Sequence, residues 1–397
     1  MDRRLLPLVA LALALVMLGA CGGGADDARP ADSSSASTTL VPTTTLLAGA
    51  QDATVCELPE QAWVGVGVGF PRSPDRLAST GTVRVAVLFA DFPDVAAGMT
   101  PEEAFDLLDG ATDFLRAVSY GRLEVELVPH LAWLRMDDPA SGYADAIATF
   151  EGHKAWIEEA VAKADPEVDF AGIDEVVVVA TPEAEVIEKG PTWMGGAFDG
   201  GTITADGESI TNAITSGADL DDWGELWLPH EMGHSLSFVD LYAFETPPDG
   251  YTRPFSLMDD IASDAPEYLA WERWHAGWID DDQIVCLASD ATPELIRIAL
   301  TRVEEAGGTK AVVAPVGETR AVVVESRRAI GYDSALTTEG AVVYTVDTSI
   351  ESGSGPVEVA NDRQALGPGE SVTVDGVTVT VIDATESGDT VEVSMAQ

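Results

Sequence analysis

Residues 226–242 (LWLPHEMGHSLSFVDLY) constrain the fold more than any other part of the chain. They hold two of the five histidines, His230 and His234, four residues apart, and Glu231 follows the first directly. On an α-helix, positions i and i+4 lie on one face with Cβ atoms about 5–6 Å apart, so both imidazoles can reach one ion. The spacing therefore predicts a helix that carries a metal site. The alternative is a partly exposed amphipathic helix that happens to carry two histidines with hydrogen-bond partners.

The residue types in this pattern suit zinc-dependent hydrolysis. Neutral imidazoles bind zinc, and the carboxylate of Glu231 can take a proton from a zinc-activated water and pass it to a leaving group. A catalytic zinc ion usually has three protein ligands and one open position. We expect Asp240 to be the third ligand, because it lies six residues after His234, where the chain can reverse. The alternatives are Glu245, Asp259, Asp219 and Asp221.

The charge balance excludes one class of partner. The chain of 397 residues has 21 Lys and Arg against 68 Asp and Glu, a formal charge of -47. A surface this acidic repels nucleic acid, so we expect no nucleic-acid partner. It suits solubility outside the cell and can favour Ca2+ as a structural ion. The candidate calcium loops, which could equally be solvated surface, are Asp219, Asp221 and Asp222, and residues 280–282.

The N-terminus predicts export. Arg3 and Arg4 precede an apolar run that is too short for an ordinary transmembrane helix and ends in LGAC at Cys21. Small residues directly before a cysteine resemble the bacterial lipobox, so residues 1–21 are interpreted as a lipoprotein signal peptide. A plain signal peptide with an incidental Cys21 is the alternative. Residues 22–50 are rich in Gly, Ser and Thr and predict a flexible tether. The expected location is the outer face of a bacterial membrane, held only through the lipid.

Cysteine usage agrees with export. If Cys21 carries lipid, Cys56 and Cys286 remain as an even pair in an oxidising compartment. We therefore predict a Cys56–Cys286 disulfide. Two buried free thiols are the alternative.

The chain between the ends alternates strand and helix patterns. Strands are predicted at 81–93, 121–129 and 174–182, and helices at 101–119 and 143–164, before the histidine helix. This order predicts an α/β (α+β) catalytic domain over residues 51–286. Residues 287–397 contain short β-rich runs, including a hairpin signal at Asp375-Gly376, and predict an all-β sandwich domain.

A family resemblance rests on several stretches in order. HEMGHSLSFVDLY (230–242) resembles the H-E-x-x-H-x-x-G-x-x-D signature of secreted bacterial metalloproteases similar to immune inhibitor A, which are related to the metzincins. FSLMDD (255–260) resembles the methionine turn of that family, and PEYLAWERWHAGWI (266–279) its proline-to-tryptophan segment. The stretches 87–94, 119–128, 322–336 and 340–347 resemble its flanking strands, so the likeness covers most of residues 80–350.

The resemblance implies a metzincin-like fold in which one zinc ion is bound by His230, His234 and Asp240. Glu231 would be general base and acid, and Met258 would lie under the metal site. Ser237 stands where this family usually has glycine. A non-glycine residue with positive φ costs on the order of 1 kcal/mol, so we expect the helix to continue slightly past this position.

The expected function is a secreted, lipid-anchored zinc endopeptidase that acts as a monomer on protein or peptide substrates. Two alternatives stay open. One is a surface binding module that keeps the fold without proteolysis, and the other is a lipoprotein with a closed structural zinc site. Candidates for stabilising the oxyanion are Tyr251, Tyr268 and His275.

Overall fold

The computed structural model describes residues 52–61, 67–196, 198, 200–244, 251–261, 267–288 and 295–396. All of these belong to one unit of the chain, Thr44–Gln397. The predicted signal peptide, the lipidated Cys21 and the tether lie outside the described residues and stay predictions. In the part that is described, no helix combines the length and the apolar character needed to cross a membrane.

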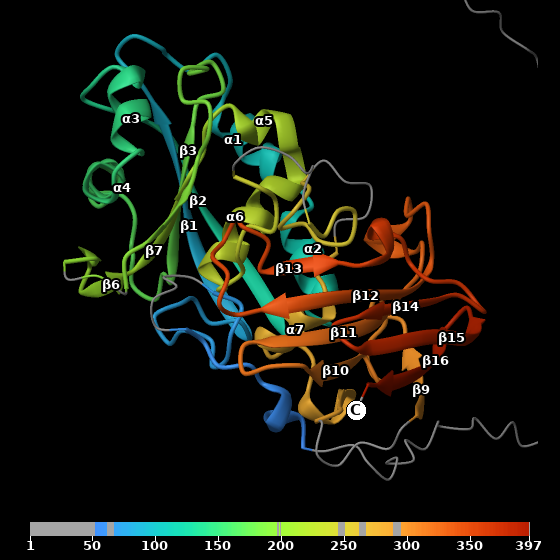
Figure 1. The fold of residues 1–397 in the computed structure, drawn as a ribbon. Helices are drawn as coiled ribbons and strands as arrows, with labels where there is room; N and C mark the ends of the chain where they lie inside the picture. Colours follow the sequence, from blue (N-terminus) through green and yellow to red (C-terminus); the bar gives the residue numbers. More distant parts are fainter. Residues whose placement is uncertain are drawn as a thin grey trace, which may run out of the picture. The chain divides into compact units, whose positions relative to one another are not determined.

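A five-stranded sheet forms the first layer (Figure 1). Its order is β2-β1-β3-β7-β4, with the strands at Leu123–Arg135, Gly81–Asp91, Glu175–Ala180, Asn212–Thr215 and Thr192–Met194. The first four strands run parallel and β4 pairs antiparallel with β7 at the edge. A separate hairpin joins β5 (Ile203–Ala205) to β6 (Glu208–Ile210). The continuous apolar run of β3 is buried along its whole length, as a central strand requires.

Helices cover both faces of this sheet (Figure 1). Alternate residues of β1 point to opposite sides: Val85 and Val87 belong to one apolar core, Ala86 and Leu88 to the other. The first core includes α1 (Pro101–Phe105), α2 (Ala111–Val118) and α6 (Trp227–Ser235). The second core packs against α3 (Ala140–Ala146) and α4 (Phe150–Ala164). The remaining α-helices of the described residues are α5 (Asp219–Trp223) and α7 (Ala270–His275), and short 3-10 turns lie between the elements.

Two of the predicted helices are interrupted. The one at 101–119 breaks at Gly110, whose φ of +89° is left-handed, and restarts as α2. The one at 143–164 breaks before Thr149, whose side chain accepts the N–H of Gly152 and caps α4. The first break follows from the left-handed backbone at a glycine and the second from a threonine cap, and the apolar period reports neither.

The C-terminal region consists of two facing sheets. One has the order β13-β12-β11-β10-β8 (Val357–Val359, Gly340–Asp347, Arg320–Arg327, Ala311–Pro315 and Ile284–Cys286). The other has the order β14-β15-β16-β9 (Ser371–Val374, Val377–Thr385, Gly388–Met395 and Ile296–Thr301). Valine, leucine and isoleucine side chains from both sheets form one apolar core between them. The predicted hairpin is confirmed, with Asp375 and Gly376 both at positive φ between β14 and β15.

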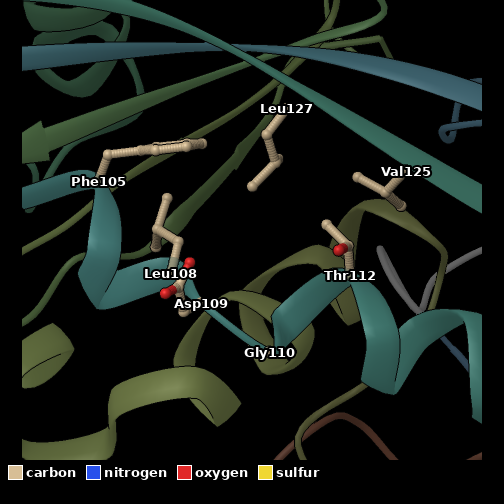
Figure 2. Close-up of a pocket in the computed structure, with 7 residues that line it drawn as sticks. All are labelled: Phe105, Leu108, Asp109, Gly110, Thr112, Val125 and Leu127. Carbon is tan, nitrogen blue, oxygen red and sulfur yellow. The ribbon is translucent and has the colours of Figure 1, made fainter. Parts of the chain in front are cut away.

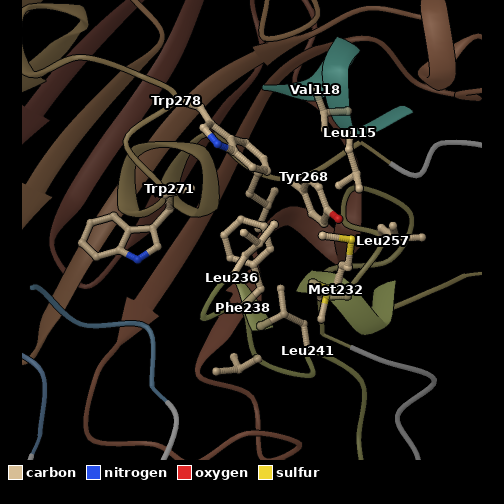
Figure 3. Close-up of a cluster of buried hydrophobic side chains, with 14 of the residues drawn as sticks. Leu115, Val118, Met232, Leu236, Phe238, Leu241, Leu257, Tyr268, Trp271 and Trp278 are labelled. Carbon is tan, nitrogen blue, oxygen red and sulfur yellow. The ribbon is translucent and has the colours of Figure 1, made fainter. Parts of the chain in front are cut away.

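The two predicted regions share a core. Val322 and Val324 of β11 pack in the core shared with the β14-β15-β16-β9 sheet, whereas Val323 packs in the core that also contains α6. Figure 3 shows part of this core, where α2, the end of α6 and α7 contribute side chains. The predicted Cys56–Cys286 disulfide is confirmed and joins the start of the described chain to β8. The coarse class, mixed α/β followed by a β region, is confirmed, while the boundary at 286/287 stays a prediction.

Candidate metal centre

Helix α6 carries both histidines and ends one residue after His234. Its end is closed by two backbone hydrogen bonds: the N–H of Ser237 donates to the carbonyl of His234 (3.0 Å), and that of Phe238 to the carbonyl of Gly233 (2.8 Å). This pair of bonds defines the Schellman motif, in which the first residue beyond the helix cap, here Ser237, is left-handed. Ser237 has a φ of +83° and so takes this conformation. The prediction that the helix continues past Ser237 is therefore wrong.

Because the chain turns there, the carboxylate of Asp240 lies against both imidazoles. Its Oδ1 is 3.4 Å from Nε2 of His230 and 3.4 Å from Nε2 of His234. Among the described residues, these three form a group whose donor atoms all lie within 4.8 Å of one another. The structure thus brings together the three side chains that the sequence assigned to one metal ion.

A hydrogen bond at Nδ1 of each imidazole orients the ring, so that its Nε2 faces Asp240. Nδ1 of His230 is 3.1 Å from the carbonyl oxygen of Leu257, and Nδ1 of His234 is 3.0 Å from that of Phe238. A carbonyl can only accept, so each Nδ1 carries a proton. In the neutral imidazole, each Nε2 then presents a lone pair towards Asp240. Metal-binding histidines are usually held in this way.

The three donors fit a zinc ion. Oδ1 of Asp240 is buried, and no hydrogen bond from the described residues satisfies it. Three electron-pair donors that face one another need a cation or a proton between them. Tetrahedral zinc with bonds of about 2.0–2.2 Å places its ligand atoms about 3.3–3.5 Å apart. The two distances of 3.4 Å agree with that spacing.

The buried charges shift one another's pKa. Burial lowers the pKa of His234, but the Asp240 carboxylate outweighs it and raises that pKa to about 9. Burial would raise the pKa of Asp240, but His234 and His230 hold it well below its usual range. Asp240 is therefore ionised at neutral pH, as a carboxylate ligand must be. A divalent cation among the three donors would displace the proton from Nε2 and keep the imidazoles neutral.

Glu231 lies directly after the first histidine and contacts an edge strand. The Thr192 hydroxyl, on β4, is 2.8 Å from Oε2 of Glu231 and 2.8 Å from the Glu231 carbonyl oxygen. Burial raises the pKa of the Glu231 carboxyl, and the two histidines oppose this shift. The residue is 9% exposed. Strand β4 thereby fixes the orientation of the carboxylate that the sequence assigned as general base.

Met258 lies beneath the helix. It is fully buried, and a β-carbon added to Gly233 would lie 2.8 Å from its sulfur. Its carbonyl accepts the N–H of Leu241 (2.8 Å), the residue after Asp240. Met258, in the stretch 255–260, therefore contacts both helix α6 and the segment that carries Asp240. Its role as the floor of a zinc site stays a prediction.

Asp219, Asp221 and Asp259, the alternatives for the third ligand that the structure describes, are not in this group. Asp219 accepts two backbone N–H groups, each at 2.9 Å, and Asp259 accepts backbone and hydroxyl donors from residues 252–253. Glu245 lies outside the described residues. Asp240 is thus the acid that the fold directs to the histidines.

Two of the three candidate oxyanion groups have other partners. The Tyr268 hydroxyl donates to the Pro229 carbonyl (2.8 Å), and Nε2 of His275 lies 2.8 Å from the Gly69 carbonyl. Both side chains are buried in the core. Tyr268 and His275 are therefore packing residues, and Tyr251 stays a candidate.

The sequence interpretation missed Tyr242. Its ring stacks beside that of His230, with the centroids 6.4 Å apart. Burial raises the pKa of its phenol, and the carboxylates of Asp240 and Glu231 raise it further. The available signal was its position in the sequence, two residues after the expected third ligand Asp240.

Some acids of the predicted calcium loops have partners within the protein. Asp280 forms an ion pair with Arg122, and Asp281 accepts the indole N–H of Trp274 (2.9 Å). In the described ranges, these acids do not join a group of three donors. Calcium binding stays a prediction.

A separate cavity of about 180 Å3 lies between α1, α2 and β2 (Figure 2). Phe105, Leu108 and Leu127 line it, together with Asp109 at the turn before α2. None of the metal-centre residues lines this cavity.

No family model matches the chain, and no curated protein matches it. Metalloproteinase-II from Bacteroides fragilis is similar to it in structure, with 13% sequence identity and a TM-score of 0.29. The match covers 53% of this chain and 57% of that one, so the chain spans little more than half the length of that protein. A function must therefore be supported by the geometry of the site itself.

Proposed function

We propose that this protein is a zinc-dependent endopeptidase of metzincin-like type, related to the immune inhibitor A-like metalloproteases. The observation that carries the proposal is the convergence of His230, His234 and Asp240, with Glu231 beside them. Three protein donors leave one position of a tetrahedral ion for water or substrate, which is typical of catalytic rather than structural zinc sites.

The protein's own residues would divide the chemistry among them. When bound, zinc would supply Lewis acidity that polarises a carbonyl and makes water acidic near neutral pH. Glu231 takes the proton of the attacking water and delivers it to the leaving amine. The Thr192 hydroxyl keeps that carboxylate in place. Because water is the attacking group in this scheme, no side-chain nucleophile and no acyl-enzyme is required.

The edge strand supports a polypeptide substrate. Strand β4 ends the order of the first sheet and carries the threonine that contacts Glu231. An extended peptide can pair with such an edge through backbone hydrogen bonds. A substrate bound there would pass directly beside the general base.

We also propose export and lipid anchoring at Cys21, with the protein acting as a monomer. The Cys56–Cys286 disulfide supports export, because such bonds persist in oxidising compartments. Metabolic labelling with a fatty acid tests the anchor: wild type should take up label, and Cys21→Ser should not.

Cleavage of casein tests the peptidase. Wild type should cleave it, a zinc chelator should stop the cleavage, and added zinc should restore it. Glu231→Ala should lower the rate by about 10²–10⁴-fold and leave the zinc content unchanged. Glu185→Ala, which removes an exposed glutamate, is the matched control and should cleave like wild type.

Two results would refute the proposal. Bound zinc without cleavage by wild type would favour the inactive binding module. An X-ray absorption spectrum with four protein ligands and no water would favour the closed structural site.

A further inference from the structure

Asp240 lies in a segment without regular secondary structure, so its place depends on what its backbone contacts. Both of its backbone groups bond to the segment between β12 and β13, in the C-terminal β region. Its N–H donates to the hydroxyl of Ser352 (3.1 Å), and its carbonyl accepts the N–H of Gly353 (2.9 Å). The acid that faces the histidines is therefore held by residues 112 positions further along the chain.

The contact extends past Asp240. The carbonyl of Gly353 accepts the N–H of Phe244 (3.0 Å), so this glycine bonds to the segment at two points. Gly353 has a φ of +70°, and a β-carbon there would lie 2.3 Å from the Phe244 ring. A glycine is thus required both for the local backbone conformation and for the close approach.

The holding segment is itself anchored to the sheet. The Asp347 carboxylate, at the end of β12, accepts the N–H of Ser349 (3.0 Å) and its hydroxyl (2.6 Å). The N–H of Thr348 donates to the Thr319 carbonyl (2.8 Å). Because these bonds fix the segment independently of Asp240, it can act as a preformed support.

A second contact from the β region reaches the other end of the site. Arg327 of β11 is completely buried, and its guanidinium donates to the carbonyls of Phe255 (2.8 Å) and Tyr268 (3.0 Å). Phe255 begins the loop in which the Leu257 carbonyl accepts Nδ1–H of His230. The β region therefore supports both the third donor and the group that orients the first.

We propose that the C-terminal β region is part of the metal centre, and that Ser352 is a positioning residue that sets the Asp240 carboxylate for metal binding. The inference rests on the proposed zinc site and deepens it. Ser352 is not one of the three donors, and it would act through its hydrogen bond to the backbone of Asp240. Loss of such outer contacts typically weakens metal binding about 10–100-fold.

Zinc affinity of the full-length protein, measured by competition with a chromogenic chelator, tests the proposal. Ser352→Ala should weaken zinc binding about 10–100-fold. Ser354→Ala is the matched control, because this exposed serine lies two residues away and only its backbone N–H is bonded in the turn. It should bind like wild type. Ser352→Thr retains a hydroxyl and should restore most of the affinity.

A double-mutant cycle separates positioning from general damage to the fold. In an Asp240→Ala background, adding Ser352→Ala should weaken zinc binding no further, since the ligand that Ser352 positions is gone. Equal weakening in both backgrounds would overturn the proposal, as would wild-type affinity in Ser352→Ala.

The affinity readout also separates this inference from the proposed activity. Zinc binding without casein cleavage would refute the peptidase, while the effect of Ser352→Ala would still decide the positioning role. A wild-type protein without zinc affinity would overturn both.

Discussion

The left-handed turn at Ser237 gives a quantitative prediction for Ser237→Gly. A non-glycine residue in the left-handed region costs about 1–2 kcal/mol. Ser237 has a φ of +83° at the end of α6, so this cost applies to it. Glycine removes the cost but adds freedom to the unfolded chain, which offsets about 0.4–1 kcal/mol. The difference between the two mid-range values is a rise in the free energy of unfolding of about 0.8 kcal/mol.

Denaturant unfolding suits this measurement, because so small a change moves the thermal midpoint of a long chain by only about 1–2 °C. Wild type and variant are compared with chelator present, so that metal binding does not contribute to stability. Ser237→Ala is the matched control. It removes the hydroxyl but keeps the β-carbon and its left-handed cost, so its stability should stay close to that of wild type.

The reasoning fails if Ser237→Gly is no more stable than Ser237→Ala. That result would mean that the turn imposes no strain on serine. The zinc affinity of Ser237→Gly should also equal that of wild type, because the Schellman bonds use backbone atoms only. A loss of affinity would show that the serine side chain, and not the turn, sets Asp240.

Three further predictions concern stability. The disulfide between Cys56 and Cys286 spans 230 positions and so restricts the unfolded chain strongly. The Cys56→Ser/Cys286→Ser variant should therefore lose about 5 kcal/mol of unfolding free energy. An unchanged denaturant midpoint would contradict this. Burial lowers the pKa of His153 from 6.5 to about 4, so the unfolded chain takes up a proton first as the pH falls. The free energy of unfolding should therefore fall by up to about 3 kcal/mol between pH 6.5 and pH 4. His153→Gln should abolish this part of the pH dependence. Burial raises the pKa of Glu175 from 4.5 to about 8, so the unfolded chain loses this proton first as the pH rises. The stability that is present below pH 4.5 should therefore fall by roughly 4 kcal/mol towards pH 8. Glu175→Gln should be more stable than wild type at pH 8 but not at pH 4.

The sequence predicted the elements whose signal is local. The predicted apolar run is β3 (Glu175–Ala180), and Asp375-Gly376 forms the predicted hairpin turn. Each of these features depends on its own residues and their immediate neighbours. The spacing of His230 and His234 likewise follows from helix geometry alone. Within such segments, the residue types leave few alternatives.

The missing features depend on contacts between distant residues. Strands β4 and β7 have only three and four residues, too few for a period, and exist because the sheet pairs them. The outcome at Ser237 was not predictable from propensity, because backbone bonds and packing there outweigh a cost on the order of 1 kcal/mol. The partner of Asp240 at Ser352 has no signal in either local segment.

The separation between Asp240 and Ser352 has a consequence for timing. On the proposed export route, a chain that crosses the membrane from its N-terminus presents both histidines well before residue 352 emerges, 112 positions after Asp240. Until then, the third donor lacks its support, and the contact must wait for the β region to fold, since such distant pairings form late. A peptidase built in this way would stay latent during its own passage across the membrane, and its activity would begin only when nearly the whole chain had arrived.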